Sequence, residues 1–231
     1  MKIFIAIPVY QGICHIKFME SLSAFMMLCR DRNIEFYYFS LTCESIISRA
    51  RNVCATKFLK SDCTHMLFVD SDIVFNPYDV LKLIEHDVPI VSGAYPYKCL
   101  SFTKIRDSIH DSHNLQSLID KSSSHCFDKH NLNELTKVEY AQTGFMLIKR
   151  ITLTNILSNF KDTISYKNDI IGYDEHSIEG VMYNFFQVGV HENRYLSEDY
   201  GFCKFAKDVG MDIYIDPSIK LTHIGQFFFH G

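Results

Sequence analysis

The stretch His65-Met66-Leu67-Phe68-Val69-Asp70-Ser71-Asp72 joins a short apolar run directly to two acidic residues. An apolar run of this length that stops at a charge is typical of a buried β-strand. Other segments have the same character: residues 2–9 are rich in isoleucine, residues 34–39 form a second short run, and residues 88–91 form another that ends at Gly93. The sequence therefore predicts four strands in its N-terminal part.

Helical patterns separate these strands. Apolar residues recur at helical spacing over residues 18–29 and 44–60, and Asn76-Pro77 is typical of an N-cap with proline at the first position of a helix that runs to about residue 86. Strands that alternate with helices predict parallel βαβ units, whose ligands bind beyond the carboxyl ends of the strands. The expected fold is an α/β fold with a Rossmann-like, mostly parallel central sheet flanked by helices.

The rest of the chain is less regular. Residues 98–133 lose hydrophobic periodicity, and we interpret them as a long functional loop. After this loop we expect one strand over residues 138–148, helices near residues 150–158, 178–187 and 198–208, and short strands around Ile213 and Leu221.

Composition limits the possible functions. The chain has 231 residues, 47% of them hydrophobic, which is enough for one domain with a substantial core. A formal net charge of -4 argues against a nucleic-acid partner, since such proteins are usually basic. The sequence has no run of about 18 apolar residues, the length of a membrane span. Eight cysteines without a C-x-x-C pair favour free thiols and a cytoplasmic location.

The acidic triplet Asp70-Ser71-Asp72 is the first candidate for chemistry. Carboxylates at the end of a strand suit Mn²⁺ or Mg²⁺, and such an ion can bridge the phosphates of a nucleotide diphosphate. Two other interpretations remain open: the aspartates cap a turn, or Asp70 is the nucleophile of a haloacid dehalogenase-type phosphohydrolase with the motif D-x-D-x-[TV]. The second is weaker because that motif usually lies on the first strand and no G-D-x-x-x-D pair follows.

Three further segments carry polar groups. In residues 44–60, Arg49 and Asn52 share the more polar side of the helix, where they would contact a nucleotide or simply be solvated. Ser197-Glu198-Asp199-Tyr200 opens a helix, and its acids either complement the helix dipole or supply a general base, preferentially Asp199. His223 precedes Ile224-Gly225, and histidine is a frequent third ligand to Mn²⁺.

Taken in order, these segments form a series. It consists of Ile7-Pro8-Val9-Tyr10, Ser48-Arg49-Ala50-Arg51-Asn52, Leu67-Phe68-Val69-Asp70-Ser71-Asp72, Val91-Ser92-Gly93-Ala94-Tyr95-Pro96, Thr143-Gly144-Phe145-Met146-Leu147-Ile148, Ser197-Glu198-Asp199-Tyr200 and His223-Ile224-Gly225. With this series the chain resembles the GT-A glycosyltransferases, in particular a viral type similar to the N-terminal glycosyltransferase domain of a large chlorovirus protein. The resemblance spans nearly the whole chain.

The resemblance implies a role for each matched position. The residues implied to bind the nucleotide sugar are Pro8, Val9, Tyr10, Arg49, Asn52, Asp70, Ser71, Asp72, Gly93 and Gly144. Asp70, Asp72 and His223 would hold Mn²⁺ or Mg²⁺. Asp199, next to Glu198, would be the catalytic acid residue of the x-E-D pattern.

The expected activity is transfer of a sugar from a nucleotide diphosphate donor, with UDP as the preferred nucleotide, to an acceptor hydroxyl. Inversion with Asp199 as base is the leading mechanism. Retention, a binding module without turnover and a sugar nucleotidyltransferase are the alternatives, the last weakened because Pro8-Val9-Tyr10-Gln11-Gly12 supplies one glycine. We expect one domain over residues 1–231, with a nucleotide-binding half (1–97), a variable loop (98–135) and an acceptor and catalytic half (136–231). The acceptor stays open.

Overall fold

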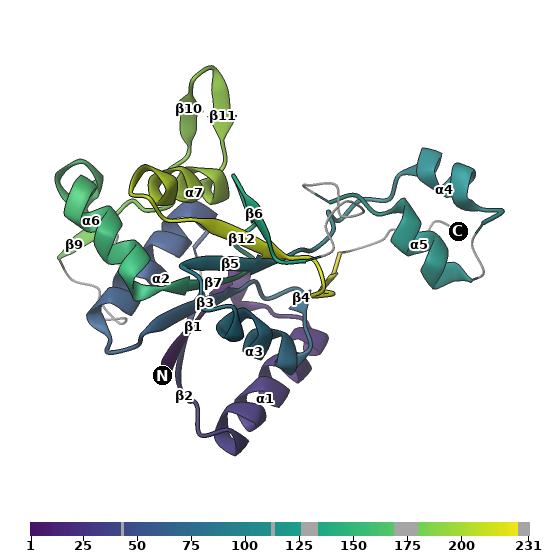
Figure 1. Ribbon diagram of the computed structural model, residues 1–231, viewed down its shortest axis with the longest axis horizontal. Helices are drawn as coiled ribbons and strands as arrows, with labels where there is room; N and C mark the ends of the chain where they lie inside the picture. Colours follow the sequence, from purple (N-terminus) through teal and green to yellow (C-terminus); the bar gives the residue numbers. More distant parts are fainter. Residues whose placement is uncertain (43, 112–113, 126–133, 169–179, 226–231) are drawn as a thin grey trace.

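A computed structural model describes residues 1–42, 44–111, 114–125, 134–168 and 180–225 (Figure 1). Its centre is a seven-stranded sheet in the order β2-β1-β3-β7-β5-β12-β6. The strands are β1 (Lys2–Val9), β2 (Glu35–Thr42), β3 (His65–Val69), β5 (Ile90–Gly93), β6 (Thr136–Val138), β7 (Phe145–Lys149) and β12 (Ile213–Asp216). Strand β1 is parallel to β2 and β3, and β5 is parallel to β12.

Two strands run against this direction. β7 is antiparallel to both β3 and β5, and β6 is antiparallel to β12. The other strands share one direction, so the prediction of a mostly parallel sheet is confirmed. Their carboxyl ends meet at one edge, where ligands of such sheets bind.

Helices cover both faces of the sheet. They are α1 (Ile16–Asp31) and α3 (Pro77–Glu85) on one face, and α2 (Ile47–Lys60), α6 (Arg150–Ile164) and α7 (Glu198–Asp208) on the other (Figure 1). Successive side chains of a strand point to opposite faces, and the core follows this rule: Phe4 packs with α2, whereas Ile3 and Ile5 pack with α1. This two-sided burial explains why the strands are continuous apolar runs.

The start of α3 agrees with its sequence. The side chain of Asn76 accepts a hydrogen bond from the backbone N–H of Tyr78 at 3.0 Å, and Pro77 occupies the first turn. The sequence predicts both features, because proline lacks the N–H that a first turn leaves unpaired.

The segment after residue 98 differs from the expected loop. It contains two short helices, α4 (Phe102–Ser108) and α5 (Leu115–Ser122), which form an arm that projects from the body (Figure 1). The side chains of Ser101 and Asn114 cap them. Neither helix contributes an apolar residue to the core clusters. In α5 the apolar residues Leu115, Leu118 and Ile119 do recur at helical spacing, a local signal that the interpretation as a loop missed. Residues 126–133 of the expected loop lie outside the described residues.

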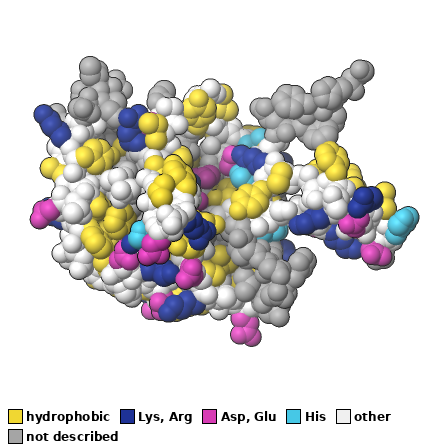
Figure 2. All heavy atoms as spheres, turned by 90° about the horizontal axis from the view of Figure 1, so that it is seen from above, with side chains coloured by type: hydrophobic (Ala, Val, Ile, Leu, Met, Phe, Trp, Pro, Cys, Tyr) yellow, Lys and Arg dark blue, Asp and Glu magenta, His cyan; other side chains and the backbone are white. Residues whose placement is uncertain are grey.

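The surface of the arm is mixed. Phe102, Ile109 and Leu115 are exposed on it, and Figure 2 shows hydrophobic side chains there beside basic and acidic ones.

Two expected elements are wrong. Residues 138–148 are not one strand: β6 and β7 lie in different parts of the sheet, with a turn between them. Residues 180–187 are not helical, since β9 (Val181–Tyr183) pairs with β8 (Ser165–Lys167); residues 178–179 lie outside the described part. The hairpin of β10 (Gly189–His191) and β11 (Arg194–Leu196) comes next along the chain.

A small two-stranded ribbon lies near the end of the chain. β4 (Ile73–Val74) pairs antiparallel with β13 (Thr222–His223), so residue 223 lies opposite Ile73. In the described parts of the chain, no helix has the length and apolar character needed to cross a membrane.

Candidate functional site

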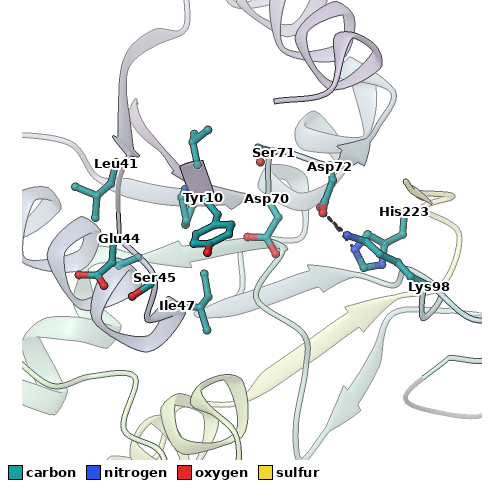
Figure 3. A pocket seen from close by; sticks show the side chains of 13 residues that line it. Tyr10, Leu41, Glu44, Ser45, Ile47, Asp70, Ser71, Asp72, Lys98 and His223 are labelled. Atoms are coloured by element: carbon teal, nitrogen blue, oxygen red, sulfur yellow. Dashed lines mark hydrogen bonds and ion pairs between the residues drawn. The ribbon is translucent and has the colours of Figure 1, made fainter. Parts of the chain in front are cut away.

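A pocket of about 360 Å³ opens at the carboxyl edge of the sheet. Seven residues that the sequence singled out line it: Pro8, Val9, Tyr10, Asp70, Ser71, Asp72 and His223. In Figure 3, Tyr10 and Asp70 lie between Glu44 and Ser45 on one side and Asp72, Lys98 and His223 on the other. The pocket is therefore elongated, with acidic groups along it and an imidazole at one end.

Backbone contacts fix the acidic triplet. The N–H of Asp70 donates to the carbonyl oxygen of Gly144 at 2.9 Å, and the carbonyl oxygen of Asp72 accepts from the N–H of Ile224 at 2.9 Å. The pairing of β4 with β13 then brings His223 next to Asp72, although the two are far apart in sequence.

The partners of His223 fix the orientation of its ring. Its Nδ1 lies 2.9 Å from the carbonyl oxygen of Pro96, which can only accept, so Nδ1 carries the hydrogen. Its Nε2 lies 3.6 Å from Oδ1 of Asp72 (Figure 3). The ring is thereby held with Nε2 toward Asp72 and the pocket, the position from which the histidine of a metal site would bind its ion.

These groups fit a divalent cation. Asp72 and His223 already face each other, and Oδ1 of Asp70 is buried and has no hydrogen-bond partner among the described residues. Within the described ranges no three His, Cys, Asp or Glu side chains are already gathered as a metal cluster. Asp72 and His223 are thus already adjacent, and Asp70 lines the same pocket.

A lysine balances the charge of Asp72. The ammonium group of Lys98 contacts Oδ2 of Asp72. Burial raises the pKa of Asp72, but the contacts with His223 and Lys98 outweigh it and lower the pKa. Lys98 is not among the predicted site residues, because its segment has no recognisable pattern.

Arg51 is a second residue that the sequence does not assign. Its side chain is only 3% exposed, and its Nη2 donates to Oδ2 of Asp70 at 3.2 Å. Its Nε lies 3.5 Å from Oε1 of Glu198 and 3.9 Å from Oδ1 of Asp199. One guanidinium therefore joins the acidic triplet to the start of α7.

A sequence signal for Arg51 exists. On α2 it lies three, four and seven residues before the buried residues Cys54, Ala55 and Phe58, so it shares their face. A charged residue on a buried face usually has a charged partner.

Asp199 has an unusual proton affinity. Burial raises its pKa from 3.8 to about 6, although the charge of Arg51 lowers it; the negative charge of Glu198 raises it further. A carboxyl group with a pKa near 6 can accept a proton at neutral pH and is a stronger base than an ordinary aspartate.

The two predicted glycines have packing roles. A Cβ on Gly144 would lie 2.4 Å from Oη of Tyr95 and 2.6 Å from Oδ2 of Asp70. A Cβ on Gly93 would lie 2.8 Å from Ile219, within the core. Gly144 thus makes room for the Asp70 carboxylate, whereas Gly93 does not line the pocket.

Arg49 and Asn52 are engaged elsewhere. Arg49 binds the carboxylate of Glu44 through Nε at 2.6 Å and Nη2 at 2.8 Å. Asn52 is buried, donates to Asn184 at 2.8 Å and accepts from the backbone of Phe186 at 2.8 Å. Neither residue lines the pocket, and their contact with a nucleotide stays a prediction.

Comparison with known proteins shows the fold. No family model and no curated protein match the sequence. Among solved structures, the A197 protein from STIV is 16% identical, with a TM-score of 0.50 over 97% of this chain and 86% of its own. GalNAc-T7, solved with UDP, GalNAc and Mn²⁺, is 8% identical, with a TM-score of 0.52 over 97% of this chain and 44% of its own.

The catalytic domain of Drosophila β1,4-galactosyltransferase 7, in complex with xylobiose, is 11% identical. Its TM-score is 0.50 over 97% of this chain and 71% of its own. The chain therefore has the GT-A fold of these glycosyltransferases, as its sequence predicts.

Proposed function

We propose that this protein is a metal-dependent glycosyltransferase that takes its sugar from a nucleotide diphosphate donor. One observation carries the proposal: Asp72 and Nε2 of His223 face each other at one end of the same sheet edge that holds Asp70 and the raised-pKa carboxyl of Asp199. The GT-A fold supports it, because fold alone does not define a function but favours one when the site agrees.

The donor would lie along the pocket. Its nucleoside would contact Pro8, Val9 and Tyr10 at the end of β1, and its diphosphate would reach toward Ser71 and Asp72. UDP is the nucleotide we favour, since GalNAc-T7 was solved with UDP. Lys98, on the pocket wall, can contact a phosphate when it leaves Asp72.

Asp70, Asp72 and His223 would hold Mn²⁺ or Mg²⁺. Such an ion neutralises the charge that develops on a departing diphosphate. The protein orients its ligands beforehand: the carbonyl oxygen of Pro96 fixes the ring of His223, and Arg51 holds the carboxylate of Asp70.

Asp199 would act as the general base. Its carboxylate takes the proton of an acceptor hydroxyl while that oxygen forms a bond to the anomeric carbon. The bond from this carbon to the phosphate oxygen breaks, its electron pair leaves with the nucleoside diphosphate, and the configuration inverts. Positioned proton transfer of this kind contributes roughly 10²- to 10⁴-fold in rate.

Retention is the other outcome within this class. NMR of the anomeric proton of the product distinguishes the two, because its signal reports the configuration of the anomeric carbon. Inversion would use Asp199 as the base, whereas retention needs no dedicated base.

The test is donor turnover. Incubation with a panel of UDP-sugars and Mn²⁺ should release UDP slowly without acceptor and faster with one. Asp199→Asn should abolish transfer while UDP still binds in the presence of Mn²⁺. Full activity of Asp199→Asn would contradict the role of Asp199, and phosphate release from a simple phosphoester would favour the phosphohydrolase.

A further inference from the structure

Arg51 lies between the acidic triplet and the first turn of α7, the two parts of the proposed site. It comes from α2, while Asp70 comes directly after β3 and both Glu198 and Asp199 open α7. Three elements that are distant in sequence thus direct four charged side chains toward one point, and the guanidinium is the cation among them.

The side chain is held rigidly. It is 3% exposed, and its guanidinium carbon lies 5.5 Å from the centroid of the Phe68 ring. A buried guanidinium on an aromatic ring has few alternative rotamers, so its position sets that of its partners.

The arrangement does not serve stability well. One cation faces three carboxylates. A fold with buried charges of this kind is often less stable than the same fold with apolar residues of similar volume in their place. The Nε and Nη1 atoms of Arg51, Oδ1 of Asp70 and Oδ1 of Asp199 are all buried, and each lacks a hydrogen bond within the described residues. Unsatisfied polar atoms that gather at one point indicate a functional demand.

We propose, on the basis of the glycosyltransferase function above, that Arg51 is a positioning residue that holds Asp70 and Asp199 in fixed relation. It contacts neither donor nor acceptor. Its Nη2 directs one oxygen of Asp70 so that the other stays free, and its Nε faces the carboxylates of α7. The planar fork of the guanidinium can face both sides at once, which the single ammonium of a lysine cannot.

The experiment compares Arg51→Lys and Arg51→Met with the wild type. A misplacement of about 1 Å in a reacting group can cost roughly 10²-fold in rate, so we expect kcat per folded protein to fall about 10²-fold in Arg51→Met. The KM for the donor should rise less, by about tenfold, because Arg51 supports the proposed metal ligand Asp70 without touching the donor. Arg51→Lys keeps the charge and should retain more of kcat than Arg51→Met, which a role in stability alone would not produce.

Arg150→Lys is the matched control. Arg150 is also an arginine held by the fold, but among the described residues it donates to backbone carbonyls of residues 58–63, at the far end of β3. The substitution Arg150→Lys should lower the melting temperature and leave kcat unchanged.

The outcomes separate the two proposals. Wild-type kcat in folded Arg51→Met overturns the role of Arg51 alone. An equal loss of kcat in Arg150→Lys overturns it too, since general destabilisation would then explain the effect. A wild-type protein that turns over no nucleotide sugar overturns the proposed function and this inference with it.

Discussion

Asp199, the base in our proposal, owes its raised pKa to its surroundings. Its carboxyl is buried beside Glu198, and these two effects raise its pKa to about 6 against the charge of Arg51. A general base works when it is deprotonated, so its pKa sets the acidic limb of the rate profile.

The first prediction is a pH dependence. The rate of transfer should rise as pH increases through about 6 and level off above it. The measurement is kcat/KM between acidic and neutral pH, corrected for folded fraction by circular dichroism. A flat profile across this range would show that another group, or none, takes the proton.

The second prediction concerns stability at the same residue. The folded-state pKa of Asp199 lies above its ordinary value of 3.8, so the ionised group weakens folding, progressively as pH rises from 3.8 to about 6 and fully above that. Asp199→Asn should therefore raise the free energy of unfolding at pH 7, by on the order of 1 kcal/mol. Urea unfolding at pH 7 and pH 3.5 checks it: the gain should be present at pH 7 and small at pH 3.5.

The third prediction concerns Lys98. Its ammonium contacts the Asp72 carboxylate that we assign to the metal, so a divalent ion must displace it. Lys98→Ala should bind Mn²⁺ more tightly than the wild type does. Its affinity for UDP in the presence of Mn²⁺ should gain less than its affinity for Mn²⁺ alone, because a phosphate partner is lost. Calorimetry with Mn²⁺ alone and with UDP measures both. Weaker binding of Mn²⁺ alone would mean that Lys98 and the ion do not compete.

At the scale of elements, the ribbon of β4 and β13 completes the site. It carries His223 to Asp72, and the N–H of Ile224 anchors it to the carbonyl oxygen of Asp72. The fourth prediction is that Ile224→Pro, which removes this donor, weakens Mn²⁺-dependent UDP binding about tenfold, since lost supporting contacts cost roughly 10- to 100-fold in metal affinity. Calorimetry with UDP in the presence of Mn²⁺ measures it.

Asn76→Ala is the matched control for the ribbon. It removes the N-cap of the adjacent α3 and should cost about 1 kcal/mol of stability. UDP affinity should stay as in the wild type. A loss of UDP binding in Asn76→Ala equal to that in Ile224→Pro would mean that both act through general loosening.

Elements also show what a sequence can predict. β1, β3 and α3 are predicted correctly because local signals decide them: an unbroken apolar run for the strands, and Asn76-Pro77 for the helix. The single strand expected over residues 138–148 is wrong because β6 and β7 belong to different places in the sheet, which only tertiary pairing reveals.

The residues of the site are likewise only partly predictable from the sequence. The sequence points to Asp70, Asp72 and His223 together, and all three line the pocket at one edge of the sheet. The spacing along α2 places Arg51 on the buried face, but it cannot show which groups pair with it, because these carboxylates come from the residue after β3 and from α7.

At the scale of the molecule, the sheet with its two helical layers forms the body, and the arm of α4 and α5 stands apart from it (Figure 1). The body holds every residue of the proposed donor site except Lys98, which lies where the arm begins. The body and the arm can therefore be tested separately.

The fifth prediction is that the arm is dispensable for folding. Replacement of residues 102–122 by a short Gly-Ser linker should leave a single cooperative thermal transition close to that of the wild type, because neither core cluster contains a described residue of the arm. Calorimetric scanning measures it. A broad transition without cooperativity would show that the arm supports the body.

The most direct test of the proposed donor site is a thermal-shift screen of nucleotides and nucleotide sugars with and without Mn²⁺. A ligand at 100 times its dissociation constant stabilises the folded state by about 2.7 kcal/mol, which such a screen detects easily. We expect UDP and UDP-sugars to raise the melting temperature when Mn²⁺ is present, and Asp72→Ala to lose this response. A melting temperature that no nucleotide changes, with or without the ion, would contradict the proposed function.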